Sequence, residues 1–164
     1  MATAHTLMDS PLGQLTLVAL DGALAGVYFD GQRNRPRPEK LGRLAAADFA
    51  GPVRQLGEYF AGERTDFDLA LDLPDDPFAR QVWALIAAIP YGQTRTYGEL
   101  ARELGEPAAA QQVGAAAARN RLCIVVPCHR VVGADGSLTG YAGGLARKRA
   151  LLDLETLVPA SRLF

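Results

Sequence analysis

The first thirty residues alternate short apolar runs with turn residues, a pattern typical of antiparallel strands. The apolar runs cover residues 6–8, 14–20 and 24–29. Asp21-Gly22 separates the last two runs and is a strong signal for a tight hairpin turn. Residues 31–43 hold five cations without any periodicity, which predicts an exposed loop. We therefore expect a β-meander at the start of the chain.

Two later segments repeat apolar residues at the spacing of a helix. The first runs from about residue 49 to residue 61 and is followed by Gly62, a residue type that often ends helices. The second covers residues 78–86 and stops before Ile89-Pro90. Between them, residues 67–73 alternate apolar and acidic side chains, which predicts one further strand.

Two more helices joined by a short turn are predicted in the second half of the chain. Thr96 can cap a helix over residues 97–104, because Glu99 at its third position completes a capping box. Gly105-Glu106-Pro107 then forms a turn, and an alanine-rich helix is expected over residues 108–119. This is the arrangement of a DNA-binding helix-turn-helix, although a helical hairpin that only packs has the same pattern. The small side chains allow close approach either to a nucleic-acid groove or to a neighbouring helix.

The segment after these helices carries the most reactive side chain of the sequence. Ile124-Val125-Val126 is β-branched throughout and predicts a short buried strand. Pro127 cannot donate to a neighbouring strand, so this strand should end there. Cys128-His129 follows at once and would lie at the mouth of the cavity that the strand faces. Residues 133–144 are glycine-rich and predict a loop, and residues 145–155 predict a final helix.

Pro74-Asp75-Asp76-Pro77 interrupts these patterns and marks the expected domain boundary. Residues 1–74 would form an antiparallel β-sheet domain with one helix. Residues 75–164 would form a mostly helical domain that contains the helix-turn-helix and the reactive cysteine. The sequence therefore predicts a fold of the α+β class.

The composition is that of an ordinary soluble globular protein, with 49% hydrophobic and 21% charged residues. No apolar run approaches the roughly 20 residues that a membrane helix needs. The first residues lack the basic-then-apolar layout of a secretory signal. We therefore expect a cytoplasmic protein without a membrane partner.

The formal net charge of −1 is spread unevenly along the chain. Residues 1–90 hold 8 Lys/Arg against 12 Asp/Glu, whereas residues 91–155 hold 8 against 6. A nucleic-acid partner would therefore bind the second half, and its affinity would be modest and sensitive to salt.

Two cysteines are too few for a disulfide scaffold. Cys123 and Cys128 lie five residues apart in the predicted strand, which would hold their Cα atoms beyond bridging distance. Two Cys and two His without paired-ligand spacing also predict no metal site. We expect no cofactor.

The two thiols differ in their neighbours. Cys123 is interpreted as a small core residue. Cys128 is a candidate nucleophile, because His129 and Arg130 follow it and an adjacent base or cation generates the thiolate. Neighbours on a strand point to opposite faces, so contact between Cys128 and His129 needs a turn after Pro127 or a bridging water. A buried, unreactive thiol remains the alternative.

The residues around Cys128 resemble the active-site segment of the O6-alkylguanine-DNA alkyltransferases. The resemblance rests on Pro127-Cys128-His129-Arg130-Val131-Val132, on Ile124-Val125-Val126 before it, on Gly140-Tyr141-Ala142-Gly143-Gly144-Leu145 after it, and on Ile89-Pro90-Tyr91-Gly92-Gln93-Thr94-Arg95-Thr96-Tyr97-Gly98-Glu99-Leu100-Ala101 upstream. It runs strongly over residues 77–155 and more weakly at Asp9-Ser10-Pro11-Leu12-Gly13. The fixed distances between these segments make it specific.

The resemblance implies a chemical role for several side chains. Cys128 would be the nucleophile, and His129 the base that receives its proton through a water. Glu155 would hold the imidazole in the right tautomer, with the logic of a hydrolase triad. Tyr141 and Lys148 would lie near the flipped guanine and stabilise it as it leaves. Taken alone, Tyr141 is a loop aromatic and Lys148 belongs to a solvated cluster.

The resemblance also implies a DNA interface. Tyr97 would rotate a phosphate and evict the base, and Asn120 would be the hinge after the recognition helix; taken alone, they are a half-buried helix-end aromatic and a helix C-terminal residue. Gln111 stands where the family usually carries an arginine that fills the space left by the base. Glutamine lacks the guanidinium plane and charge, so we expect weaker flipping or DNA affinity, with Gln112 or Arg119 as imperfect substitutes. The remaining residues of the predicted interface are Arg95, Ala109, Ala110 and Arg130.

The implied activity is DNA repair by a monomer that acts on double-stranded DNA. An alkyl group would pass irreversibly from O6-alkylguanine to Cys128 after base flipping, with O4-alkylthymine as a further candidate substrate. Three other interpretations remain: a non-catalytic relative that binds alkylated bases and recruits other repair factors, a regulator switched by cysteine alkylation, and a Cys–His hydrolase. Retention of Cys128 argues against the first. No additional DNA-binding or activation domain and no oxyanion hole are predicted, which argues against the other two.

Overall fold

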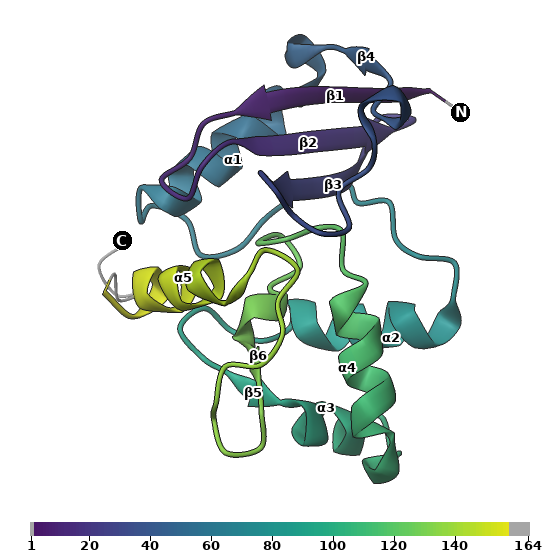
Figure 1. Cartoon of the computed structure of the whole chain (residues 1–164), viewed down its shortest axis with the longest axis vertical. Helices are drawn as coiled ribbons and strands as arrows, with labels where there is room; N and C mark the ends of the chain where they lie inside the picture. The colour runs from purple at the N-terminus through teal and green to yellow at the C-terminus, as the bar shows by residue number, and fades with distance from the viewer. Residues whose placement is uncertain (1, 158–164) are drawn as a thin grey trace.

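The computed structural model describes residues 2–157 and begins with a four-stranded sheet (Figure 1). Its strands are β1 (Thr3–Met8), β2 (Leu15–Leu20), β3 (Ala23–Phe29) and β4 (Arg43–Leu44). The strand order is β3-β2-β1-β4, in which β1, β2 and β3 form antiparallel pairs and β4 runs parallel to β1. The predicted meander is therefore confirmed, and β4 is an addition that begins at Arg43, the last residue of the expected loop.

The hairpin between β2 and β3 follows from its two turn residues. Asp21 and Gly22 have φ angles of 49° and 86°, the left-handed conformations that a tight hairpin turn requires. The helix α1 (Ala50–Phe60) packs against the sheet through the buried Leu56 and Tyr59. Its bounds agree with the predicted helix to within one residue.

The strand predicted over residues 67–73 is wrong. Only Leu71 forms a bridge, to Leu24 of β3. Instead, the side-chain amide of Gln55 on α1 makes two hydrogen bonds to the backbone of Asp68. It accepts from the Asp68 N–H at 2.9 Å and donates to the Asp68 carbonyl at 3.0 Å. A side-chain amide therefore satisfies the backbone groups that a neighbouring strand would otherwise bond.

The second half of the chain is mostly helical. Its helices are α2 (Pro77–Ala87), α3 (Tyr97–Glu103), α4 (Ala110–Ala118) and α5 (Leu145–Leu157). Two short strands, β5 (Arg95–Thr96) and β6 (Val131–Val132), pair in parallel. Single 3-10 turns occur at η1 (Pro38–Lys40), η2 (Ala46–Phe49), η3 (Pro107–Ala109) and η4 (Cys128–Arg130). All four predicted helices of this half are present.

The helix pair α3 and α4 forms as its capping residues predict. The Glu99 N–H donates to Thr96 Oγ1 at 3.1 Å, and the Thr96 N–H donates to Glu99 Oε1 at 2.9 Å, which completes the capping box. On α4, Ala116 is buried and its carbonyl accepts a 3.1 Å hydrogen bond from the Trp83 indole of α2. One face of the alanine-rich helix thus packs against a neighbouring helix, and its other face is free for a ligand.

The predicted strand at Ile124-Val125-Val126 is a turn instead. Ile124 has a φ of 72°, and the Val126 N–H donates to the Leu122 carbonyl at 2.9 Å. Asn120 closes the turn, because its side chain accepts from the Leu122 N–H and donates to the Val126 carbonyl, each at 2.9 Å. The turn brings residues 122 and 126 closer together than an extended strand would.

This turn also corrects the expected separation of the two thiols. Cys123 and Cys128 come within hydrogen-bonding reach of each other, and both remain free cysteines. Within residues 2–157, no group of three or more His, Cys, Asp or Glu could hold a metal ion. None of the helices in that range combines the length and apolar character that crossing a membrane requires.

Candidate active site

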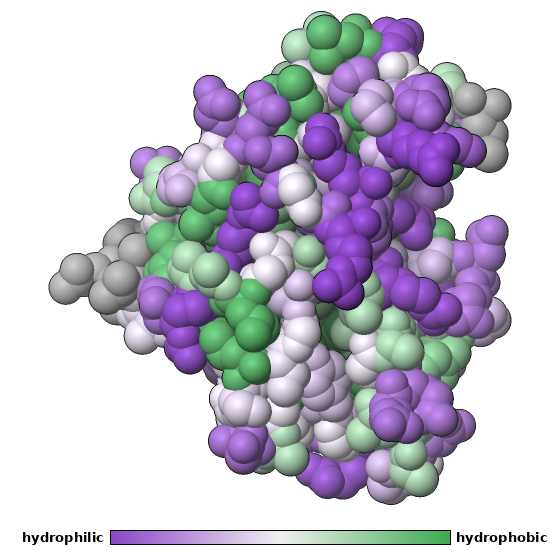
Figure 2. Space-filling view, in the orientation of Figure 1, coloured by the Kyte–Doolittle hydropathy of each residue, from purple (hydrophilic) through white to green (hydrophobic). Residues whose placement is uncertain are grey.

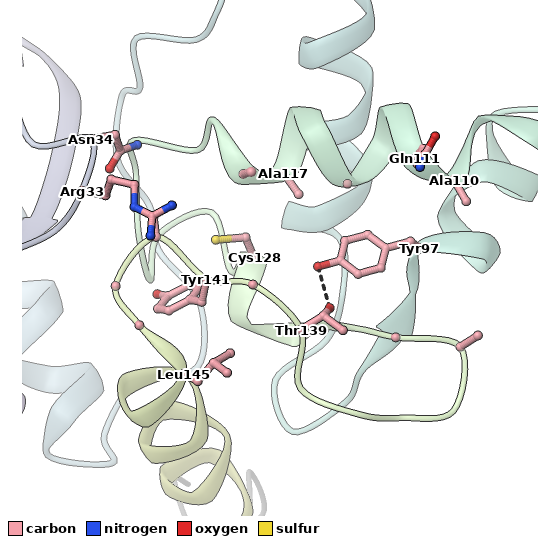
Figure 3. A pocket seen from close by; sticks show the side chains of 18 of the residues that line it. Arg33, Asn34, Tyr97, Ala110, Gln111, Ala117, Cys128, Thr139, Tyr141 and Leu145 are labelled. Atoms are coloured by element: carbon pink, nitrogen blue, oxygen red, sulfur yellow. Dashed lines mark hydrogen bonds between the residues drawn. The ribbon is translucent and has the colours of Figure 1, made fainter.

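Cys128 lies in a pocket of about 1100 Å³ between the two halves of the chain (Figure 3). The walls come from α4, from the start of α3, from residues 133–145 and from the loop after β3. Cys128 is the first residue of η4 and is only 7% exposed. The bend after Pro127 therefore presents a nearly buried thiol to a roomy cavity.

The surroundings of Cys128 favour its thiolate. A hydrogen bond from Cys123 lowers the pKa of Cys128 most, and burial opposes this effect. The Asn120 amide donates to the Cys128 sulfur at 3.0 Å and lowers the pKa further, as does the charge of Lys148. The net pKa lies below the usual value of the thiol, which makes the sulfur a better nucleophile at neutral pH.

His129 is buried beside this thiol and is held by Glu155. Its Nε2 atom lies 2.7 Å from Glu155 Oε2, and its side chain is 0% exposed. Burial lowers the pKa of His129 below its usual value, although the carboxylate works against this shift. A neutral imidazole that bonds a carboxylate through Nε2 carries its proton there. Nδ1, which has no hydrogen-bond partner among the described residues, is then the basic nitrogen.

Glu155 joins several parts of the molecule. Arg130 donates to both of its oxygens, at 2.8 and 2.9 Å, and the Tyr59 hydroxyl of α1 donates to Oε2 at 2.6 Å. Burial by itself raises the pKa of Glu155, but the hydrogen bonds from His129 and Arg130 and their charges lower it to about 2. The carboxylate is therefore ionised at neutral pH and held from both halves of the chain.

Arg130 does not lie where we expected it. We placed it at the DNA interface, but it is 4% exposed, and besides Glu155 it bonds the Ile89 carbonyl at 2.7 Å. A buried acid draws the guanidinium inward, because an unpaired charge there would be costly. The assignment of Arg130 to DNA contact is corrected: it is a structural partner of Glu155.

The loop between β6 and α5 forms one wall of the pocket. Lys148 is buried and donates to the Thr139 and Gly140 carbonyls at 2.7 and 3.4 Å, so it holds this loop rather than lying in a solvated cluster. Tyr141 lines the pocket below Cys128 (Figure 3). A Cβ at Gly143 would lie 2.6 Å from the ring of Phe29, so only glycine lets the loop pack this closely against β3.

The residues expected to contact DNA divide into two groups. Tyr97, Ala110 and Gln111 line the pocket, and the Tyr97 hydroxyl accepts from Thr139 Oγ1 at 3.2 Å. The others do not line it: they are Arg95, Ala109, Gln112 and Arg119. Arg119 lies at the far end of α4, about 12 Å along the helix axis from Gln111. There it approaches Asp76 at 3.8 Å, so it cannot substitute for a side chain at position 111.

Four residues of this site escaped the interpretation of the sequence. Tyr59 and Cys123 bond the central side chains, and Arg33 and Asn34 line the pocket from the loop after β3. Cys123 was recognised only as a core residue, and nothing in residues 31–43 beyond their positive charge signalled a pocket. Tyr59, Arg33 and Asn34 enter the site through contacts between distant parts of the chain, and Cys123 enters it through the turn at Ile124.

Both halves of the chain match known families. Residues 4–73 match the ribonuclease-like domain of 6-O-methylguanine DNA methyltransferase, and residues 77–157 match the DNA binding domain of the same protein. A methylated-DNA–protein-cysteine methyltransferase of Mycolicibacterium paratuberculosis is 51% identical and aligns over 92% of this chain and 91% of its own length. One of Salmonella typhimurium is 42% identical over 87% of this chain and 90% of its own.

Solved structures agree with these matches. The crystal structure of Mycobacterium tuberculosis OGT in complex with DNA is similar with a TM-score of 0.88 at 46% identity, and the comparison covers 98% of this chain and 97% of that one. The crystal structure of Mycobacterium tuberculosis O6-methylguanine methyltransferase gives a TM-score of 0.87 at 45% identity, over 96% of each chain. The α+β fold, with an N-terminal sheet and a helical C-terminal half, is the fold of these structures. The chain therefore belongs to the family of methylated-DNA–protein-cysteine methyltransferases, which act in DNA repair.

Proposed function

We propose that this protein repairs DNA by moving the alkyl group of O6-alkylguanine to Cys128, irreversibly and once per molecule. The observation that carries the proposal is the thiol of Cys128, whose pKa is lowered and which faces a pocket of about 1100 Å³ beside the helix pair α3 and α4. The thiolate attacks the alkyl carbon. A sulfur–carbon bond forms, the carbon–oxygen bond breaks, and guanine leaves with the electron pair on its oxygen.

The thiol of Cys128 is activated by two buried side chains, His129 and Glu155, that act in sequence. The Cys128 proton passes through a water to His129 Nδ1, which hydrogen-bonds no described residue. Glu155 accepts from Nε2 and stabilises the imidazolium that results. The charge of Lys148 lowers the pKa of Cys128, and its bonds to the loop carbonyls position Tyr141. The Tyr141 hydroxyl lies within reach of Cys123, its residue lines the pocket, and it can donate to the departing guanine.

Base flipping is required because Cys128 is only 7% exposed and cannot reach an oxygen inside a base stack. In this proposal Tyr97, at the start of α3, rotates the phosphate of the extruded nucleotide. Gln111, in the first turn of α4, enters the stack behind it; both residues line the pocket of Cys128, which supports these roles. Asn120 joins α4 to the turn that carries Cys128, so it couples the recognition helix to the nucleophile.

The product explains why the reaction runs once. An S-alkylcysteine is a thioether, and no residue of the described pocket is placed to hydrolyse it. O4-alkylthymine presents the same alkyl–oxygen bond, and a cavity of about 1100 Å³ has room for either base. We include it as a second substrate of the same chemistry.

Intact mass spectrometry tests the proposal. Incubation with a duplex that contains O6-methylguanine should add the mass of one CH2 group per protein molecule, and Cys128→Ser should abolish this gain. A non-catalytic relative would bind the lesion tightly without any gain in mass. That result would refute transfer and favour the binding function.

A further inference from the structure

Among residues 2–157, Arg33 has the one formally charged side chain that lines the pocket of Cys128. It comes from the loop after β3, so the N-terminal sheet contributes it. Figure 3 shows Arg33 and Gln111 at opposite ends of the pocket, with Cys128 between them. Figure 2 shows hydrophilic residues over the loop after β3 and paler residues, neither strongly polar nor strongly apolar, over the loop between β6 and α5. The positive charge is therefore confined to one rim of a nearly neutral cavity.

The loop that carries Arg33 is fixed rather than loosely attached. Gln32 is 5% exposed, and its Oε1 accepts from the Phe29 N–H at 2.9 Å. Its Nε2 donates to Asn34 Oδ1 at 2.6 Å, and the Arg35 N–H donates to the Gln32 carbonyl at 3.2 Å. The hydrogen bonds of the buried Gln32 thus fix the backbone before and after Arg33. The fixed backbone limits the directions in which the Arg33 side chain can leave the loop.

The guanidinium of Arg33 forms no hydrogen bond or ion pair with any residue in the range 2–157. Two other arginines near this loop, Arg35 and Arg147, do have such partners. Arg35 donates to Thr16 Oγ1 at 3.0 Å, and Arg147, beneath the same loop, donates to the Leu12 and Asp30 carbonyls. The charge of Arg33 is therefore available to a ligand.

We propose that Arg33 binds a phosphate oxygen of the nucleotide that is extruded toward Cys128. The inference rests on the proposed function, because it takes a flipped nucleotide as the ligand. A guanidinium binds phosphate through two parallel charge-assisted hydrogen bonds, and a phosphate accompanies every extruded base. Gln111 brings no charge to the other end of the pocket, so Arg33 supplies the cation from the opposite wall.

The experiment compares Arg33→Gln with Arg43→Gln. Both changes remove one positive charge from the N-terminal half, but Arg43 is exposed on β4, at the far edge of the sheet from the pocket (Figure 1). Affinity and single-turnover transfer are measured over a range of salt concentrations on duplexes that contain O6-methylguanine or O6-carboxymethylguanine. Transfer is also measured on free O6-benzylguanine, which has no phosphate. Circular dichroism confirms that the variants are folded.

Arg33→Gln should slow transfer from the duplex about tenfold or more at low salt, because the charge-assisted hydrogen bonds to the phosphate are lost. It should also reduce the slope of log affinity against log salt by about one, because one phosphate contact is lost. The free base should react at an unchanged rate, and Arg43→Gln should change neither reaction. Arg33→Lys should restore part of the rate and most of the salt slope, because it keeps the charge without the planar fork.

Three results would overturn the assignment. They are an unchanged duplex reaction in Arg33→Gln, an equal loss on duplex and free base, and a loss seen only with a duplex of O6-carboxymethylguanine. The last would assign the guanidinium to the anionic adduct instead of the backbone. Failure of the proposed function is distinguishable, because wild-type protein would then gain no mass from either substrate.

Discussion

Nε2 of His129 lies 2.7 Å from Oε2 of Glu155, and both side chains are shielded from solvent. This bond fixes which imidazole nitrogen carries the proton, so the other nitrogen, Nδ1, is the base for the neighbouring thiol. The carboxylate is in turn held by Arg130 and by Tyr59 of α1. The N-terminal half therefore helps to hold the buried carboxylate that orients the imidazole.

Cys123→Ala should raise the pKa of Cys128, because the hydrogen bond from Cys123 is the largest influence that lowers it. The rate of transfer to free O6-benzylguanine should fall at neutral pH and recover at alkaline pH, where the thiolate forms unaided. A pH–rate profile measures the shift. Cys123→Ser, which keeps a donor, is the matched control and should shift the profile less. An unchanged midpoint with a lower plateau would contradict the role given to Cys123.

Tyr59→Phe should lower the free energy of unfolding by about 2 kcal/mol, the usual worth of a buried hydrogen bond to a charged group. His129 and Arg130 still hold the carboxylate, so the transfer rate should hardly change. Urea unfolding measures the loss of stability. Tyr91→Phe serves as the control, because the Tyr91 hydroxyl is buried without a hydrogen-bond partner among the described residues. Equal losses in the two variants would refute the bond to Glu155 as the cause.

The protein should lose stability as the pH falls below neutrality. Burial lowers the pKa of His129, so below pH about 6.5 the unfolded chain takes up a proton that the folded chain does not. The pKa of Glu155 is lowered from 4.5 to about 2, so its contribution is fully present above pH 4.5 and is lost as the pH falls toward 2. That contribution is about 3 kcal/mol. Melting temperatures from pH 8 to pH 3 check this, and a constant value down to pH 4 would refute it.

Gln111→Arg should raise the rate of transfer from duplex DNA and leave the reaction with a free guanine-type substrate nearly unchanged. A guanidinium fills the space behind an extruded base better than an amide and adds a charge that attracts DNA. Single-turnover kinetics on both substrates measure the difference. Gln112→Arg adds the same charge at a neighbouring exposed position outside the pocket and is the control. A similar gain in both variants, or an equal effect on duplex and free base, would count against a role in flipping.

Local patterns predicted the parts of the fold that depend on local physics. The 3.6-residue periodicity located the helices, and the capping box at Thr96 and Glu99 located the start of α3. The spacing around Cys128 pointed to His129 as its partner. These features depend on residues within one or two helical turns of each other, which is the range over which sequence patterns are informative.

The errors arose where a distant or unforeseen contact overrides local preference. The β-branched run at Ile124 forms a turn because the Asn120 side chain satisfies its backbone groups, and the side chain of Gln55 does the same at Asp68. The hydrogen bond from Tyr59 to Glu155 spans 96 residues, and no periodicity signals such a pair. Arg33 likewise reaches the pocket only once the sheet has folded over the helical half.

The central claim is that the sulfur of Cys128 is the atom that receives the alkyl group. It is tested most directly by digesting the protein after reaction with an O6-methylguanine duplex and locating the added methyl group by tandem mass spectrometry. This test distinguishes Cys128 from Cys123, the second thiol, which lies within hydrogen-bonding reach of Cys128. We predict one methyl group per molecule, all of it on Cys128, and none in His129→Ala at the same early time. Methyl on Cys123, or a lesion bound without any methylated peptide, would contradict the account.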